Sequence, residues 1–290
     1  MNKKKHGFLK MILMYCRKFN KHDTFGLTAE VSFYLLTAMF PFFILLFILA
    51  SQISDTMQSF LMNIITFLPK DLENMVTEVL VSFTQSLPII ITATVFGLWY
   101  MSSVILTISK ALNRFYGIRE TRGYLKLKGL SLLFSLFIIL LIIISFALII
   151  FGEGTQFLLE KNNILSFLIQ ESVWNYARYI GVFLVILITI LAMFKILPNK
   201  FLSVKAVLAG ATLTTIAWCI TSYGFSFYVN YFSTYHILYG SLASVIVLIT
   251  WVYLSAFVIL LGGSLNAFWY RLRMAKKLTK ARKHSFEEDM

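Results

Sequence analysis

Charged residues are scarce in this chain. Asp, Glu, Lys and Arg make up 13% of its 290 residues, whereas soluble globular proteins carry roughly 25%. Hydrophobic residues make up 59%, and they fall in long uncharged blocks. A soluble protein needs polar faces to meet water, and this sequence has too few of them. The composition therefore predicts an all-α, polytopic membrane protein.

Metal-binding and redox-active residues are also few. The two cysteines, Cys16 and Cys219, lie in a basic segment and in an apolar block, so no disulfide is predicted. The four histidines show no spacing that is typical of a metal site. Walker A, G-x-S-x-G and H-E-x-x-H motifs are missing as well. We therefore expect no cofactor and no enzymatic activity.

The scarcity of acidic residues argues against a nuclease in particular. Phosphodiester hydrolysis normally uses two metal ions held by several carboxylates. On the side of the membrane that the topology below assigns to the cytoplasm, the acidic residues are Asp23, Glu30, Glu120 and the tail residues Glu287, Glu288 and Asp289. The paired carboxylates at Glu287–Asp289 lie in a charged tail that we expect to be solvated and disordered.

Six apolar blocks are long enough to be membrane spans, since about 20 apolar residues in a helix cross the ~30 Å hydrocarbon core. Lys195 is the one Asp, Glu, Lys or Arg inside them. The blocks are 31–53, 87–108, 130–151, 179–197, 206–229 and 240–262. They define a membrane domain over 30–270, whose last span is expected to end at Gly262–Gly263.

Basic residues gather in four segments. Residues 1–29 contain seven Lys or Arg, 109–129 contain six, 195–205 contain three and 271–283 contain seven. The other three connections contain two basic and seven acidic residues, apart from Arg178 at the start of the fourth span. The positive-inside rule then places both termini in the cytoplasm. That orientation agrees with an even number of spans.

Segments outside the spans also have helical periodicity. Apolar residues between 54 and 86 recur at helical spacing on both sides of Pro69, which predicts two interfacial amphipathic helices at the outer surface. Residues 157–159 and 164–169 predict a shorter outer cap. Residues 8–19 predict an in-plane helix within the basic cytoplasmic N-terminus (1–29). At the other end, 271–290 are predicted to form a charged cytoplasmic tail.

The formal net charge of +13 is accounted for mostly by this topology. Basic loops orient the protein and contact anionic lipid headgroups, so membrane lipids are the expected partners. Nucleic acid is not expected, because no basic module with interleaved aromatic residues is present. The sequence leaves homo-oligomerisation open.

Three segments resemble a known family. They are VSFYLLTAMFPFF (31–43), ALNRFYGIRETRGYLKLKG (111–129) and YGSLASVIVLITWVYLSAFVILLGGSLNA (239–267). With the span pattern, they resemble the YihY/BrkB family of bacterial inner-membrane proteins, formerly labelled ribonuclease BN-like. The similarity covers roughly residues 10–272. It implies a multi-pass protein of the bacterial cell membrane with envelope-related transport or export as the suggested function, and the ribonuclease label is regarded as a misassignment there.

The resemblance also implies signature positions. They are Phe33, Tyr34, Pro41, Asn113, Arg114, Tyr116, Gly117, Glu120, Arg122, Tyr239, Gly240, Ser241, Gly262 and Asn266. Two positions depart from the family's pattern. Ser264 stands where many members carry an acidic residue, and His236 where many carry Asn. If that acidic residue couples transport to cations or protons, its absence puts such coupling in doubt for this chain.

The run R-E-T-R at 119–122 has two interpretations. An ion pair between Glu120 and a flanking arginine would shape a cytoplasmic turn after Gly117, although surface pairs contribute only ~0–1 kcal/mol. Alternatively, Arg114, Arg119 and Arg122 would bind a lipid headgroup or a ligand phosphate.

Glu30 and Pro41 are exceptions in the first apolar block. Glu30 is predicted in the first turn of a helix capped by Thr28, where the helix dipole favours a carboxylate. Lys110, Arg114 and Lys195 lie at the right depth to pair with it. Pro41 lies about ten residues into the span, and a proline there is expected to kink the helix.

Polar residues within the spans are Ser, Thr, Asn and Gly, which allow close helix packing. They could instead line a path for a neutral or lipid-like substrate. With the resemblance, the most favoured function is transport, export or flipping of an amphipathic or envelope-related substrate. The alternative is a membrane organiser or partner-binding protein that transports nothing.

Overall fold

The computed structural model describes residues 23–53, 73–74, 77–78, 87–160, 171–231 and 242–288. Six long helices in this part of the chain are apolar enough to cross a membrane. They are α2 (Thr24–Ile53), α5 (Leu87–Tyr116), α6 (Tyr124–Glu160), α8 (Glu171–Ile196), α9 (Val204–Tyr231) and α11 (Leu242–Glu288). Each corresponds to one predicted span, so the all-α architecture with six candidate spans is confirmed.

The helices run beyond the apolar blocks that predicted them. Helix α5 continues to Tyr116 and α6 begins at Tyr124, so the connection between them is 117–123 rather than 109–129. Residues 157–159, predicted as part of an outer cap, form the end of α6. Backbone hydrogen bonds within a helix do not depend on apolar side chains, and the helices therefore extend into their charged ends.

The last helix corrects two further expectations. Helix α11 passes through Gly262–Gly263 without a break and continues to Glu288. The charged segment from 271 onward is therefore helical as far as Glu288, where a disordered tail was expected. Helix α11 packs against α2, α5 and α9, and Gly262 and Gly263 lie at this packed surface, where a side chain would meet Thr214, Leu112 and Phe194.

Helix α2 begins earlier than predicted, and this changes the surroundings of Glu30. Its first residue is Thr24, and the amide of Leu27 donates to the carbonyl of Asp23. Thr28 therefore does not cap the helix; its hydroxyl donates to the carbonyl of Thr24, one turn earlier. Glu30 lies in the second turn rather than the first.

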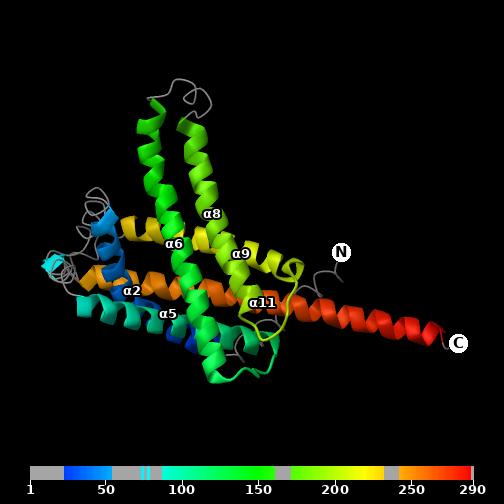
Figure 1. The fold of residues 1–290 in the computed structure, drawn as a ribbon. Helices are drawn as coiled ribbons and strands as arrows, with labels where there is room; N and C mark the ends of the chain where they lie inside the picture. The colour runs from blue at the N-terminus through cyan, green and yellow to red at the C-terminus, as the bar shows by residue number, and fades with distance from the viewer. Residues whose placement is uncertain are drawn as a thin grey trace.

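Pro41 lies within α2, and the helix continues on both sides of it. In Figure 1 α2 changes direction partway along its length. The ring of Pro41 removes the hydrogen bond to the carbonyl of Thr37, which is the expected origin of such a bend.

The six helices contact one another in a closed cycle. Along the chain, α2 packs on α5, α5 on α6, α6 on α8, α8 on α9, α9 on α11, and α11 returns to α2 and also touches α5. Helices α6 and α8 lie side by side, and their far ends project well away from the other four helices (Figure 1). The most buried apolar side chains, including Leu112, Phe115, Phe194, Leu197 and Leu260, join α5, α8 and α11.

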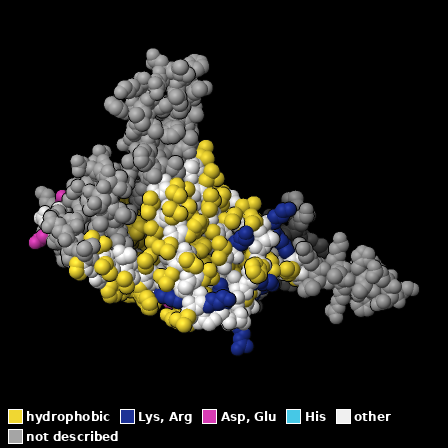
Figure 2. Space-filling model, in the orientation of Figure 1, with side chains coloured by type: hydrophobic (Ala, Val, Ile, Leu, Met, Phe, Trp, Pro, Cys, Tyr) yellow, Lys and Arg dark blue, Asp and Glu magenta, His cyan; other side chains and the backbone are white. Residues whose placement is uncertain are grey.

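The polarity of the bundle is inverted relative to a soluble protein. Large apolar side chains such as Phe33, Ile91 and Leu133 are more than half exposed, and apolar atoms cover much of the face in Figure 2. Many hydroxyl-bearing residues, such as Thr28, Ser102 and Ser135, are buried instead. This distribution suits a helical bundle surrounded by lipid.

Several predicted segments lie outside the described residues. They are the in-plane helix at 8–19, most of the amphipathic stretch 54–86, the segment 164–169, and the positions His236, Tyr239, Gly240 and Ser241. Within 54–86, residues 73–74 and 77–78 are helical.

Close contact between α9 and α11 yields the first prediction. A methyl group at Gly262 would lie 2.7 Å from Cβ of Thr214. Gly262→Ala should therefore overpack this contact, at a cost of about 1–3 kcal/mol, and lower the thermal unfolding midpoint of the purified protein in detergent.

Gly224→Ala is the matched control. Gly224 lies on α9, one of the same two helices, and nothing lies within 4 Å of the methyl group that the substitution would add. Thr214→Ala in the Gly262→Ala background should restore part of the lost stability. Equal stability of the Gly262 and Gly224 variants would contradict the close contact.

Candidate functional site

The end of α5 forms a tight turn that leads into the candidate site. Gly117 has a φ of 68°, a left-handed conformation that glycine adopts without strain. Its amide donates to the carbonyl of Arg114 at 3.2 Å, and the amide of Ile118 donates to the carbonyl of Asn113 at 2.9 Å. This pair of bonds is a Schellman motif, and it turns the chain sharply into 117–123.

Within that connection, Glu120 and Arg122 form a bidentate ion pair. Nε of Arg122 donates to Oε1 of Glu120 at 2.8 Å, and its Nη2 donates to Oε2 at 2.7 Å. The backbone amide of Arg122 adds a third bond to Oε1 at 3.0 Å. Asn113 on α5 donates from Nδ2 to Oε2 at 2.7 Å. The predicted ion pair is present, with Arg122 as the partner of Glu120.

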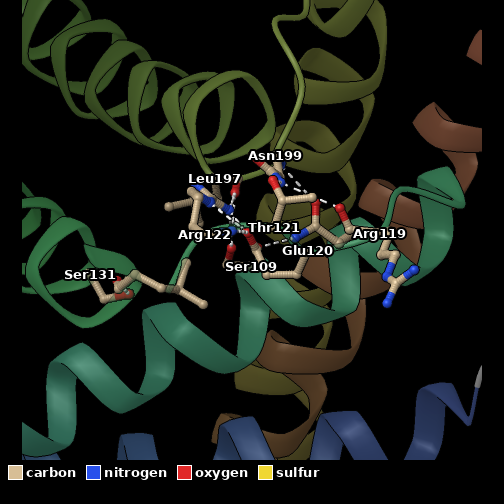
Figure 3. Close-up of polar contacts among 10 residues, drawn as sticks. Ser109, Arg119, Glu120, Thr121, Arg122, Ser131, Leu197 and Asn199 are labelled. Carbon is tan, nitrogen blue, oxygen red and sulfur yellow. Dashed lines mark hydrogen bonds and ion pairs between the residues drawn. The ribbon is translucent and has the colours of Figure 1, made fainter. Parts of the chain in front are cut away.

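The same group holds the connection between α8 and α9 in place. Nη2 of Arg122 and Oγ of Ser109 both donate to the carbonyl of Leu197, each at 2.9 Å. The amide of Asn199 donates to Oδ1 of Asn113 at 2.8 Å, and its side chain donates to Oγ1 of Thr121 at 2.8 Å. Figure 3 shows these side chains converging between the two connections. We call the set Ser109, Asn113, Glu120, Arg122, Leu197 and Asn199 the loop clamp.

The electrostatics of the loop clamp follow from these bonds. The hydrogen bond from Arg122 lowers the pKa of Glu120, and the amide of Asn113 adds to the effect, while partial burial opposes it. The Glu120 side chain is 25% exposed and that of Arg122 is 13% exposed. Water screens such a pair less than a fully exposed one, so the contact stabilises more than a typical surface ion pair.

Arg119 and Arg122, two of the three arginines of the alternative anion site, point in different directions (Figure 3). Arg122 is engaged by Glu120 and by Leu197. Arg119 contributes its backbone carbonyl, which accepts a bond from Asn199, while its side chain points away from the loop clamp (Figure 3). Arg114 lies in the last turn of α5 and is exposed.

A second group of signature residues joins α5 to α11. Nδ2 of Asn266 donates to Oη of Tyr116 at 2.7 Å, and the ring of Tyr116 packs edge-on against Tyr270 at 5.7 Å. Gly210 on α9 leaves room for the side chain of Asn266. Nη2 of Arg271 donates to the carbonyl of Phe115. The residues around 271, predicted to begin a separate tail, therefore pack on the end of α5.

Glu30 is an exposed residue whose carboxylate accepts a hydrogen bond from Oγ1 of Thr107 at 2.9 Å. The expected partners were the basic residues Lys110, Arg114 and Lys195, whereas the structure supplies a buried hydroxyl of α5. Ser264, which stands where many family members carry an acid, is 6% exposed, and its hydroxyl donates to the carbonyl of Leu261 at 2.8 Å.

Lys128 is an interior residue that the sequence did not reveal, because it was counted among the loop charges that orient the protein. Lys128 lies in α6 and is 6% exposed. Its Nζ donates to Oγ of Ser103 at 3.0 Å and lies 4.2 Å from the centre of the Trp99 ring. One signal was available in the sequence: Lys128, Ser131 and Ser135 share a helical face at spacings of three and four residues.

A metal site is not formed by the described residues. In that part of the chain, no group of three or more His, Cys, Asp or Glu lies close enough to hold an ion.

Because the carboxylate form of Glu120 is the one that the loop clamp binds, stability should depend on pH. A lowered folded-state pKa means that this contribution is fully present above the ordinary value of 4.5 and is lost as pH falls through the lowered value. Glu120→Gln should lower the unfolding midpoint at pH 7 by an amount equivalent to about 1–3 kcal/mol.

The difference between wild type and Glu120→Gln should shrink as pH falls below 4.5. Glu30→Gln is the control, since the carboxylate of Glu30 is exposed and bound by a neutral hydroxyl. If the difference in unfolding midpoint between wild type and Glu120→Gln stayed constant down to the lowest pH at which both proteins fold, the charged pair would be ruled out as its cause.

Comparison with known proteins agrees with this architecture. The profile of the family described as Virulence factor BrkB matches residues 15–286. The ribonuclease-like protein YfkH of Bacillus subtilis (strain 168) is 30% identical over 270 residues, which are 88% of this chain and 93% of the relative.

Shorter matches link the chain to membrane proteins. The UPF0761 membrane protein PSHAa0171 of Pseudoalteromonas translucida (strain TAC 125) is 36% identical over 75 residues, 26% of this chain and 25% of the relative. A UPF0761 membrane protein of Tolumonas auensis is 37% identical over 78 residues, 27% of this chain and 26% of the relative. No solved structure matches. The chain is thus a multi-pass membrane protein that belongs to the Virulence factor BrkB family.

Proposed function

We propose that this protein transports, exports or flips an amphipathic, envelope-related substrate across the bacterial cell membrane. The observation that carries the proposal is the polar interior of the bundle. Among the described residues, buried polar side chains occur on α2, α5, α6, α9 and α11, within helices that are otherwise apolar. Such groups are costly at membrane depth, and they commonly mark a path for a polar substrate.

The polar interior is densest along α5. Ser102, Ser103, Thr107, Ser109 and Asn113 are each at most 7% exposed. Thr107 reaches Glu30 on α2, and Ser103 reaches Lys128 on α6. Helix α5 thus presents polar groups to two different neighbours, which supports a path that more than one helix lines.

The bend in α2 supports the same proposal. Pro41 leaves one backbone carbonyl of the helix without its usual partner, and broken or bent helices are common where transporters form binding sites.

The orientation is part of the proposal. Lys and Arg side chains gather on one side of the face in Figure 2, and Asp and Glu lie at the opposite end. By the positive-inside rule, the basic side with the loop clamp and the end of α11 would face the cytoplasm. Anionic headgroups of the inner leaflet would then be the lipids at this basic side.

The alternative remains a membrane organiser that transports nothing. The hydroxyls of Ser32, Ser131 and Ser135 donate to carbonyls of their own helices at 2.7 to 2.9 Å, as they do in ordinary helix packing. Access of water to the interior distinguishes the two functions, because transport requires it and packing alone does not.

Cysteine accessibility tests the proposal. In a variant with Cys16 and Cys219 replaced by Ser, single cysteines at Ser32 and Ser264 should react with a charged methanethiosulfonate reagent from at least one side of a proteoliposome. Both positions are buried, with 5% and 6% exposure, so labelling requires a water-filled opening.

A cysteine at Phe33 is the lipid-facing control, because this side chain is 62% exposed on the outside of the bundle and a charged reagent does not enter lipid. A cysteine at Thr121 reports sidedness and should react from the cytoplasmic side alone. If the reagent labelled neither the cysteine at Ser32 nor the one at Ser264 from either side, the result would favour the membrane organiser.

A separate assay tests for ribonuclease activity, which the name of the Bacillus subtilis relative suggests. We propose that this chain is not an enzyme, and highly purified protein with Mg²⁺ or Mn²⁺ should therefore leave single-stranded RNA and tRNA precursors intact. Cleavage that co-purifies with the protein and that Glu30→Gln or Asp23→Asn abolishes would overturn this expectation.

A further inference from the structure

A buried lysine lies in the second turn of α6, at the start of a candidate membrane span. Helix α5 runs from Leu87 to Tyr116, and the residues that contact the ammonium of Lys128 are Trp99 and Ser103, near its middle. Ser103 is about 20 Å from the Tyr116 end at 1.5 Å per residue. Long basic side chains near helix ends usually direct their charge toward water. The side chain of Lys128 instead directs its charge toward the interior.

The partners of this ammonium are neutral. Nζ of Lys128 donates to Oγ of Ser103 at 3.0 Å and to the carbonyl of Trp99 at 3.3 Å, and the indole ring lies 4.2 Å away. The Trp99 carbonyl already accepts bonds from Ser102 at 2.7 Å and Ser103 at 2.9 Å. It therefore does not need the lysine, whose bond to it is the longest of the three.

The lysine has no balancing negative charge among the residues that the structure describes. In the described part of the chain, no carboxylate lies within ion-pair distance of Nζ of Lys128. The charge of Lys110, which acts on it electrostatically, is of the same sign. An unpaired cation in a low-dielectric interior costs free energy that a methionine or leucine would avoid. Packing alone therefore does not account for a lysine at this position.

Hydroxyl groups surround the same face. Ser131 and Ser135 follow Lys128 on its face of α6 and are 1% and 0% exposed. Across the helix contact, Ser102 and Ser103 are 0% and 7% exposed. Each of the four now donates to a carbonyl of its own helix. A serine hydroxyl rotates freely enough to turn a donor toward an anion.

We propose that Lys128 and Ser103 bind the anionic group of the substrate, a phosphate or carboxylate on an amphipathic molecule, and that the Trp99 ring beside the ammonium gives way to it. The inference rests on the proposed transport function and names its substrate class. The ammonium supplies the charge, the serines supply donors, and the Trp99 ring holds the ammonium while no anion is bound. An anion bound at the middle of α5 displaces the ring from the ammonium and separates the facing sides of α5 and α6.

Binding of short-chain lipids to the full chain in detergent tests the site by titration calorimetry. Dihexanoylphosphatidic acid should bind wild type, and Lys128→Met should weaken binding by about tenfold or more, as expected for a lost charge-assisted bond. Lys128→Arg keeps the charge and should retain most of the affinity. Lys126→Met is the matched control, because Lys126 lies on the same helix and is exposed; its affinity should stay within about twofold of wild type.

Two further probes identify the source of the anion. Dihexanoylphosphatidylcholine should bind weakly, since its headgroup carries no net charge, and equal binding of the two lipids would overturn the proposal. Inorganic phosphate that binds as tightly as the anionic lipid would support the anion site and assign it to free anions. If Lys128→Met and Lys126→Met lost equal affinity for dihexanoylphosphatidic acid, or if neither lost any, the proposal would be overturned.

A second readout applies where Lys128→Met does not fold. Binding at the site should change tryptophan emission in wild type, and Trp99→Phe should remove that change while lipid still binds. An emission response that survives Trp99→Phe would overturn the proposal. The anion site and the transport function can fail separately. If anion binding depends on Lys128 but cysteines at Ser32 and Ser264 are not labelled, the site is supported and transport is rejected. If those cysteines are labelled but no Lys128-dependent binding occurs, transport is supported and the site is rejected.

Discussion

The bidentate contact between Arg122 and Glu120 fixes the connections on which the arrangement of the helices depends. It lets Arg122 reach the carbonyl of Leu197 while Glu120 accepts a bond from Asn113. One ion pair thereby ties the end of α5, the start of α6 and the passage from α8 to α9. The apolar residues packed below it, Phe115 and Phe194 among them, are nearly inaccessible to solvent. The polar contact sets the relative positions of the helix ends, and the packing below depends on those positions.

Helix contacts in lipid gain little from the hydrophobic effect, because lipid tails are as apolar as the side chains. Close approach and hydrogen bonding must therefore hold this bundle together. Gly262 lies directly against Thr214, and Gly210 leaves room for Asn266, which reaches Tyr116. The signature residues Gly262, Asn266 and Tyr116 thus lie at contacts between helices. Their pattern in the sequence has a structural explanation that does not require a ligand at each position.

The sequence predicted the six candidate spans because uncharged blocks of that length have few stable alternatives to a helix in lipid. It did not predict where the helices end, since the backbone continues in helical form through Arg114 and past Gly263. The ion pair of Glu120 was predictable from residues two positions apart. The contacts of Arg122 with Leu197 and of Arg119 with Asn199 were not, because they join segments 75 and 80 residues apart that only the tertiary fold brings together. Lys128 was misplaced for the same reason.

Helix α5 is the element that relates these features to a mechanism. Its end carries Asn113 in the loop clamp, its next turns carry Thr107 opposite Glu30, and its middle carries Ser103 beside Lys128. The contacts at the loop clamp involve an ion pair with several charge-assisted bonds, whereas those at Lys128 involve neutral partners. Under the proposed function, α5 and α6 would therefore separate beside Lys128, in the second turn of α6, while they stay joined at 117–123. A strong attachment in the connection and a weak contact just beyond it is the arrangement that lets a pair of helices open around a substrate without losing its register.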